Sequence, residues 1–472
     1  RFVPFLNICK ENHTAIRIGV NHGSLSDRIM SRYGDTPEGM VESCMEFLRI
    51  CVAENFTDVV ISIKASNTVV MVKTVRLLVD VMEKEGMTFP LHLGVTEAGD
   101  GEDGRIKSAL GIGALLSDGL GDTIRVSLSE APEAEIPVAR KLVDYVLLRQ
   151  DHPYIPGLEA PEFNYLSPER RKTKAVRNIG GEHVPVVIAD RMDGKTEVNP
   201  QFTPDYIYAG RALPEQREEG VEYILDADVW QGEAGTWPAF NHAQLPLMGE
   251  CDAALKFLFI PYMAQTDEVI ACLKYHPEVV IISQSNHPNR LGEHRALVHQ
   301  LMTEGLQNPV VFFQHYSEDD AENLQIKSAV DMGALIFDGL CDGIFLFNQG
   351  SLSHAVVDAT AFGILQAGRT RTSKTEYISC PGCGRTLYDL EKTIARIKAA
   401  TSHLKGLKIG IMGCIVNGPG EMADADYGYV GAGRGKISLY KGKVCVEKNI
   451  PEEEAVERLL EFIRTDREEN QQ

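Results

Sequence analysis

The chain has 472 residues, enough for roughly two to four domains. Hydrophobic residues make up 44 % of it and charged residues 24 %, ordinary values for a globular protein with sizeable cores. With 47 basic and 67 acidic side chains, the formal net charge is −20. A surface this acidic repels phosphate backbones and anionic lipids, so we expect no nucleic-acid partner and no membrane partner.

Neither a run of about 18 apolar residues nor a cleavable signal sequence is recognisable. We therefore expect a cytoplasmic protein whose ten cysteines are reduced thiols. The sequence begins with Arg1 and not with Met, so its natural beginning is expected to be processed, trimmed or missing.

Residues 1–150 alternate between strand and helix patterns. Strands are expected at 15–20, 58–63, 91–95 and 123–128, and helices at 40–54, 69–85, 106–116 and 137–148. This alternation predicts an α/β fold with a parallel sheet and crossover helices. Four such units are half of a TIM-type (β/α) barrel, which normally needs about 250 residues. The other half must come from upstream or from another chain.

A polar, proline-punctuated boundary opens a second predicted domain, residues 151–350. Strands are expected at 184–189, 223–227, 257–261, 279–283, 310–314 and 344–347. This domain repeats part of the first, because about twelve positions are identical between the 21-residue windows 106–126 and 326–346. The density of identity favours duplication of a structural unit over chance.

The two copies differ at the ends of their strands. In the first copy the charged or polar residues are Lys64, Glu97, Arg125 and Ser127, and 220 positions later stand Gln284, Ser317, Phe345 and Phe347. Barrel active sites are built at the C-terminal ends of the strands. We therefore expect the first copy to be catalytic and the second to be a degenerate, barrel-like structural domain.

Residues 351–472 predict a third, α+β domain. A strand at 375–379 leads into Cys380-Pro381-Gly382-Cys383, and a helix with Leu387, Leu390, Ile394 and Ile397 on one face follows. A second strand, 407–412, leads into Cys414. A hairpin at 437–447 and a final helix from residue 451 complete the domain.

The cysteines of this third domain have the spacing of a metal site. Cys380 and Cys383 can turn both sulfurs toward one centre, and Cys414 follows about thirty residues later, near a Gly- and Pro-rich loop. Three thiolates fit a 4Fe–4S cluster with one iron left for another ligand. A zinc site, with His403 as the only nearby fourth ligand, and reduced structural cysteines remain alternatives.

Each strand of the first domain ends near a residue that can bind an anion or move a proton. Arg17, Lys64 and Arg125 could neutralise a diphosphate, and Glu97 among these cations could serve as an acid or a base. Any single one could instead form a structural salt bridge at the barrel rim. The loss of the set in the second copy favours a binding site.

Four segments resemble a known family. The segments Tyr377–Thr386 and Gly413–Glu421 closely resemble the cluster domain of the 4-hydroxy-3-methylbut-2-enyl diphosphate synthase family, and Arg17–Leu25 and Val60–Ser66 look like its barrel. The long insertion between barrel and cluster domain resembles the three-domain form of plants and some bacteria, whose insert is a second, non-catalytic barrel.

The resemblance implies an iron–sulfur oxidoreductase of the non-mevalonate route to isoprenoids. Its reaction would be the reductive ring opening of 2-C-methyl-D-erythritol 2,4-cyclodiphosphate to 4-hydroxy-3-methylbut-2-enyl diphosphate, with electrons from ferredoxin or flavodoxin. Glu97 would donate a proton, and Glu421 would be a displaceable cluster ligand. The cluster would be held by Cys380, Cys383, Cys414 and Glu421, and the substrate by Arg17, Asn21, Ser24, Lys64, Arg125 and Ser127.

The family's barrel begins well before the equivalent of Arg1, so residues 1–150 would be its C-terminal half, and the chain is expected to be inactive if it is the whole polypeptide. Barrel and cluster could pair within one chain or across a homodimer. Two other interpretations stay open. One is a non-catalytic or truncated iron–sulfur or zinc scaffold, and the other is a pterin-binding barrel transferase, which leaves the cysteines unexplained.

Overall fold

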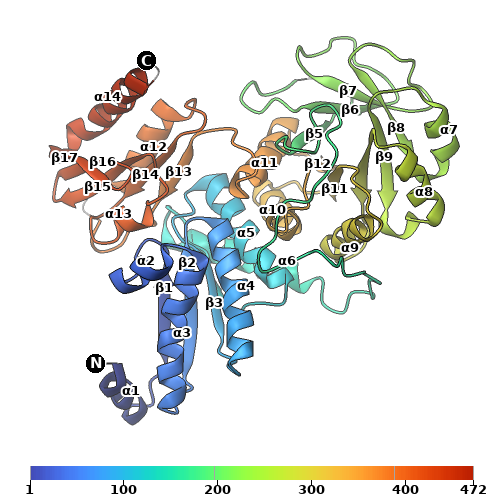
Figure 1. Cartoon of the computed structure of the whole chain (residues 1–472). Coiled ribbons are helices and arrows are strands. Elements are labelled where there is room, and N and C mark those ends of the chain that lie inside the picture. The colour runs from blue at the N-terminus through green and yellow to red at the C-terminus, as the bar shows by residue number, and fades with distance from the viewer. Residues whose placement is uncertain (1, 196, 387, 471–472) are drawn as a thin grey trace. The chain divides into compact units, whose positions relative to one another are not determined.

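The computed structural model describes residues 2–195, 197–386 and 388–470, so Leu387, expected on a helix face, lies outside the described residues. The chain forms two compact units (Figure 1). One unit combines Arg1–Lys141 with Lys374–Gln472, and the other is Leu142–Ser373. The predicted first and third domains therefore belong to one unit.

Four parallel strands form the first sheet, in the order β1-β2-β3-β4. They are β1 (Ile16–Asn21), β2 (Val59–Ala65), β3 (Leu91–Val95) and β4 (Thr123–Arg125). The helices of this region are α1 (Phe2–Glu11), α2 (Asp27–Tyr33), α3 (Pro37–Ala53), α4 (Thr68–Lys84), α5 (Gly101–Ser117) and α6 (Glu135–Leu147). The four predicted strands and four predicted helices are confirmed, whereas α1 and α2 were not predicted.

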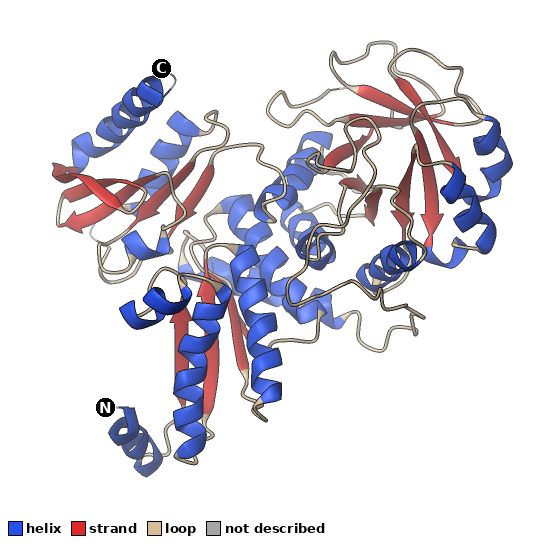
Figure 2. Ribbon diagram, viewed as in Figure 1, coloured by secondary structure: helices blue, strands red, loops and turns tan. Residues whose placement is uncertain are grey.

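Helix α3 illustrates how the local sequence builds this layer. The hydroxyl of Thr36 caps the helix by accepting a hydrogen bond from the N–H of Gly39, and Pro37 occupies the first turn. Its fully buried side chains recur every three or four residues: Met40, Cys44, Leu48 and Cys51. Burying each large apolar side chain contributes about 1.5–3 kcal/mol, and α3 and α4 lie along the sheet as a result (Figure 2).

The second unit contains a closed barrel of eight parallel strands, in which β12 pairs with β5 to close the ring. The strands are β5 (Val186–Asp190), β6 (Tyr206–Gly210), β7 (Glu222–Asp226), β8 (Thr236–Asn241), β9 (Lys256–Pro261), β10 (Val279–Gln284), β11 (Val310–Tyr316) and β12 (Gly343–Asn348). Its helices are α7 (Leu245–Glu250), α8 (Asp267–Tyr275), α9 (Arg290–Thr303), α10 (Ala321–Phe337) and α11 (His354–Ala367). Among the described residues, no α-helix separates β5, β6, β7 and β8.

The structure supports the internal repeat. Helices α5 and α10 begin and end 220 residues apart, and β2, β3 and β4 correspond to β10, β11 and β12. Three of the four strands in the open sheet thus match three consecutive strands of the closed barrel at the same offset. This correspondence agrees with the prediction of half a TIM-type barrel followed by a second barrel.

The cysteine-containing part of the first unit is a five-stranded α+β layer. Its strands are β13 (Glu376–Ser379), β14 (Lys408–Met412), β15 (Tyr427–Gly433), β16 (Lys436–Lys441) and β17 (Val444–Pro451), the first three parallel and the rest antiparallel. The helices are α12 (Leu390–Thr401), α13 (Gly418–Glu421) and α14 (Glu452–Asn470). Side chains of α12 and α14 share one buried core with this sheet.

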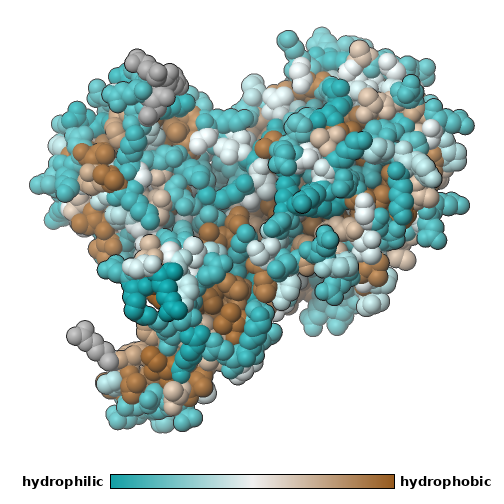
Figure 3. All heavy atoms as spheres, in the orientation of Figure 1, coloured by the Kyte–Doolittle hydropathy of each residue, from teal (hydrophilic) through white to brown (hydrophobic). Residues whose placement is uncertain are grey.

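Hydrophilic residues cover most of the face seen in Figure 3, with apolar patches between them. Within the described part of the chain, no helix is both long enough and apolar enough to cross a membrane.

Candidate functional site

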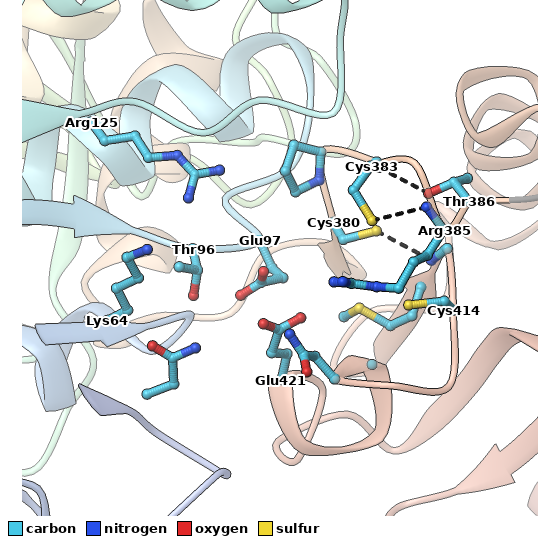
Figure 4. A pocket seen from close by; sticks show the side chains of 17 residues that line it. Lys64, Thr96, Glu97, Arg125, Cys380, Cys383, Arg385, Thr386, Cys414 and Glu421 are labelled. Carbon is cyan, nitrogen blue, oxygen red and sulfur yellow. Dashed lines mark hydrogen bonds between the residues drawn. The ribbon is translucent and has the colours of Figure 1, made fainter. Parts of the chain in front are cut away.

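The first unit contains a cavity of about 240 Å³ between the loops after β1–β4 and the loops after β13 and β14 (Figure 4). Strand-end residues of the half-barrel form one wall, and the three cysteines with their neighbours form the other. The residues that carry chemistry in these walls are Asn21, Lys64, Thr96, Glu97, Arg125, Cys380, Cys383, Arg385, Cys414, Asn417 and Glu421.

Sheet register aligns the polar groups of the half-barrel wall. Asn21 pairs with Lys64, Lys64 with Gly94, and Gly94 with Arg125, so the four positions form one row across four parallel strands. Residues in one row project from the same face of a sheet. Lys64 and Arg125 both line the cavity, and Gly94, which has no side chain, stands between them in the row, so these two cations face a shared volume.

The cations of this wall lie close enough together to change the protonation of Lys64. Burial, together with the positive charges of Arg125 and Arg17, lowers the pKa of Lys64. An anion bound in this row would relieve that repulsion. The arrangement therefore suits a ligand with two or more negative charges.

Glu97 lies two residues beyond β3 in a left-handed backbone conformation, with φ of +50°. Its side chain is buried, and its Oε2 atom has no hydrogen-bond partner among the described residues. Burial, together with the neighbouring carboxylate of Glu421, raises the pKa of Glu97 above its ordinary value. The carboxyl group can therefore keep its proton near neutral pH and donate it to a ligand in the cavity.

Glu421 faces Glu97 from the opposite wall (Figure 4). It ends the short helix α13, and burial raises its pKa as well. Its loop rests on the half-barrel, because the hydroxyl of Ser66 donates a hydrogen bond of 3.3 Å to the Glu421 carbonyl. The backbones also touch, since a Cβ atom added to Gly23 would lie 2.1 Å from the carbonyl oxygen of Gly420.

The three cysteines lie on the second wall with hydrogen-bond donors directed at their sulfurs. Cys380 follows β13 and accepts a bond of 3.2 Å from the N–H of Gly413, and Cys383 accepts one of 3.4 Å from the N–H of Arg385. Although burial opposes the effect, backbone N–H groups and the Arg385 guanidinium lower the pKa of Cys414. The thiolate, the form in which cysteine binds metal, is therefore favoured at Cys414, whereas burial raises the pKa of Cys380.

These surroundings fit an iron–sulfur cluster. N–H groups directed at cysteine sulfurs are the usual second layer of such sites. No three His, Cys, Asp or Glu side chains in the described ranges are close enough together to hold one metal ion. A four-iron cluster has no such requirement, because each of its ligands binds a different iron.

Eight of the residues predicted for the site line the cavity, and three lie beside it. The three outside the lining are Arg17, Ser24 and Ser127. Arg17 contributes charge to the Lys64 environment, and the Ser127 hydroxyl accepts a hydrogen bond of 3.2 Å from Arg125. Ser24 lies against the loop of α13, where a Cβ atom on Gly420 would come within 3.3 Å of its hydroxyl.

Nine lining residues were not among the predicted site residues, and four of them have polar side chains: Thr96, Arg385, Thr386 and Asn417. Thr96 is next to Glu97 in the sequence, and the other three belong to the two cysteine-containing segments. Their closeness in sequence to predicted site residues could therefore have identified them. Arg385 is the most informative of them, because its guanidinium lies beside Cys414.

Comparison with known proteins agrees with this geometry. Residues 1–140 match the family described as the GcpE TIM-barrel domain, and residues 376–465 match the GcpE protein C-terminal domain. The chain is 95 % identical over 469 residues to the 4-hydroxy-3-methylbut-2-en-1-yl diphosphate synthase (flavodoxin) of Bacteroides thetaiotaomicron, covering 99 % of this chain and 76 % of the relative.

Proteins with the same description are 84 % identical in Bacteroides fragilis, over 98 % of this chain and 74 % of the relative, and 62 % identical in Parabacteroides distasonis, over 98 % and 76 %. Identity of this extent reaches through both units, including the closed barrel. The chain therefore belongs to the 4-hydroxy-3-methylbut-2-en-1-yl diphosphate synthase (flavodoxin) family.

Proposed function

We propose that this chain catalyses the reductive ring opening of 2-C-methyl-D-erythritol 2,4-cyclodiphosphate to 4-hydroxy-3-methylbut-2-enyl diphosphate, a step in isoprenoid biosynthesis. One observation carries the proposal: a row of cations, a buried carboxyl group and three cysteine thiols line the same cavity. A pterin-binding transferase would use the cations but not the thiols.

The half-barrel wall binds the diphosphate in this proposal. Lys64 and Arg125 neutralise its charge, and Asn21 hydrogen-bonds to it from the same row. Ser127 orients the Arg125 guanidinium, and Arg17 adds positive potential. Ser24 completes the set of substrate-binding residues beside the loop of α13.

The second wall would hold a 4Fe–4S cluster through Cys380, Cys383, Cys414 and Glu421. When bound, the cluster supplies electrons one at a time and a Lewis-acidic iron. The fit rests on the donors that face the cysteine sulfurs and on the lowered pKa of Cys414. Both walls come from one chain, so a homodimer is not required to join them.

Glu97 would supply a proton. The conversion removes one oxygen atom from the carbon skeleton as water, which consumes two electrons and two protons. The buried Oε2 atom of Glu97 has no other partner among the described residues, so a proton held there can pass to the departing oxygen.

The electrons would come from flavodoxin, the donor that the names of the relatives specify. Cys383 is exposed, so an electron carrier can approach this edge of the site without a change in fold. We place the reaction in the cytoplasm, where the thiols stay reduced.

An anoxic turnover assay with reduced flavodoxin tests the function. Reconstituted protein in which the half-barrel is completed to a full barrel should form 4-hydroxy-3-methylbut-2-enyl diphosphate, and Lys64→Met should lower kcat/KM at least 100-fold, because a cation facing the diphosphate is lost. Lys84→Met, on the exposed end of α4, is the matched control and should keep full activity. Product formation that is insensitive to Lys64→Met would refute the assigned diphosphate wall.

A further inference from the structure

Glu97 and Cys380 belong to different layers of the first unit, yet the segments that carry them are joined by contacts that the proposed chemistry does not use. Residue 98 forms a parallel β-bridge with residue 379, so the neighbours of the two functional residues are paired directly. Both Ala98 and Ser379 are fully buried. The bridge brings the segment carrying Glu97 next to the strand that ends at Cys380.

The hydroxyl of Ser129 lies at the centre of this junction. It is 2.8 Å from the Ser379 hydroxyl, 3.0 Å from the Ser379 carbonyl oxygen and 3.1 Å from the Cys380 carbonyl oxygen. A hydroxyl has one proton and two lone pairs, so it can donate to one of these carbonyls while accepting from Ser379. The N–H of Ser129 also donates to the Gly99 carbonyl, which ties the Glu97 loop to the same point.

A buried ion pair holds the other end of β13. The Lys107 ammonium lies 3.1 Å from the Glu376 carboxylate and 3.4 Å from the Tyr377 carbonyl oxygen, and both charged side chains are buried. Lys107 belongs to α5, the helix that begins directly after the Glu97 loop. An ion pair in such surroundings is held in one geometry, because separating it would leave a buried charge.

The internal repeat offers a comparison in which this junction is missing. Lys327 stands 220 residues after Lys107, and it pairs with Glu318 within the closed-barrel unit. The residue at the position of Glu318 in the first copy is Ala98, which has no charge to offer. Lys107 pairs instead with Glu376. The equivalent lysines of the two copies therefore have different partners, and the partner of Lys107 belongs to the cysteine-containing layer.

We propose that Ser129, Ser379, Lys107 and Glu376 form a clasp that fixes the Glu97 loop against the strand ending at Cys380, and that Ser129 is a positioning residue for the proton transfer. This inference rests on the proposed function for its catalytic part, whereas the clasp itself is a property of the fold. Ser129 does not line the cavity, so it acts through the residues it holds.

Hydrogen–deuterium exchange on the full chain, as purified and after anoxic reconstitution, tests the clasp. Ser129→Ala should speed exchange about tenfold or more in residues 96–101 and 376–383 together, since both segments lose the same anchor. Ser129→Thr keeps the hydroxyl and should restore slow exchange. Ser108→Ala is the control, because Ser108 is a buried serine on α5 whose hydroxyl has no partner in the described part of the chain.

Turnover of the reconstituted variants tests the positioning role. Ser129→Ala should lower kcat at least tenfold with KM within twofold and with iron content unchanged, because no substrate contact is removed. Unchanged exchange in either segment overturns the clasp whether or not the wild-type chain turns over. Faster exchange in both segments with unchanged kcat overturns the positioning role. A wild type with a completed first barrel but without turnover refutes the function while leaving the exchange result standing.

Discussion

At the scale of single residues, the site holds Lys64 and Glu97 in surroundings that shift their pKa values away from the ordinary ones. Lys64 lies among cations, and Glu97 is buried opposite another carboxyl group. Both were predicted to be site residues, because they stand at the ends of predicted strands. The shared row was not predicted, because it depends on the register of β1 to β4.

The role of Glu97 predicts a specific kinetic defect. Glu97→Gln keeps the shape of the side chain but cannot release a proton, so kcat should fall about 10²- to 10⁴-fold with a smaller change in KM. Steady-state kinetics of the reconstituted variant measure both. Glu133→Gln, on an exposed turn after β4, serves as the control, and an equal loss in both variants would contradict the assignment.

A buried histidine in the closed barrel makes stability depend on pH. Burial, aided by the charge of Arg290, lowers the pKa of His294 to about 3, and its Nδ1 atom lies 2.7 Å from the Ser283 hydroxyl. Below about pH 6.5 the unfolded chain therefore binds a proton at His294 that the folded chain does not bind. The contribution of neutral His294 to the free energy of unfolding is complete above about pH 6.5 and is lost as the pH falls toward 3. Between pH 7 and 5 the loss should be about 2 kcal/mol.

Urea unfolding followed by tryptophan fluorescence measures this loss, because Trp230 and Trp237 both lie in the closed-barrel unit. His294→Gln should be less stable at pH 7 but should lose about 2 kcal/mol less on acidification than the wild type. His183→Gln, an exposed position in the same unit, should behave as the wild type. A wild-type pH dependence in His294→Gln would exclude His294 as the cause.

At the scale of secondary-structure elements, the half-barrel strands were predictable because each is a short apolar run between turn residues. β6 and β8 were not predicted, since β6 ends in glycine and β8 contains Pro238, which argues against a strand by local rules. Closure of the barrel overrides that preference, because β8 completes the ring between β7 and β9. α2 was missed because it has only seven residues.

The loop after β1 is predicted to be sensitive to one added methyl group. Gly23 has φ of +82°, and a Cβ atom there would lie 2.1 Å from the carbonyl oxygen of Gly420. Gly23→Ala should therefore push the loop of Glu421 away, lowering the iron bound after reconstitution at least twofold, besides costing about 1 kcal/mol of stability for the left-handed backbone.

Gly34→Ala separates the two effects. Gly34 has a similar φ of +74°, but its added Cβ atom would come no closer than 3.5 Å to Thr36. It should show the loss of stability in thermal unfolding but bind iron as the wild type does. If Gly23→Ala and Gly34→Ala retain equal iron, the contact between the two loops does not hold the site together.

At the scale of the whole molecule, sequence patterns indicated three consecutive domains, with divisions near residues 150 and 350. The structure groups residues differently, because α11 packs on β5 and β12 and extends the closed-barrel unit to Ser373. The hydrogen bond from Ser66 to Glu421 spans 355 positions, and no local pattern reports a contact of that kind. The family resemblance, and not periodicity, indicated that half-barrel and cysteines share one site.

The closed barrel is predicted to fold without the rest of the chain. A fragment of residues 142–373 should unfold cooperatively, with a fluorescence midpoint within a few degrees of that in the full chain, and should bind no iron after reconstitution. A fragment of residues 142–342 lacks β12 and should not fold, because the ring cannot close. A folded barrel in the shorter fragment, or none in the longer, would contradict the division into units.

Iron and acid-labile sulfide per chain, measured after anoxic reconstitution, decide whether the three cysteines of the cavity hold an iron–sulfur cluster. The wild type should contain about four irons and four sulfides, Cys414→Ser should lose more than half of them, and Cys445→Ser should lose none, because its thiol lies on β17 outside the cavity. About one zinc per chain without sulfide, or equal iron in the two cysteine variants, would contradict a cluster at this site.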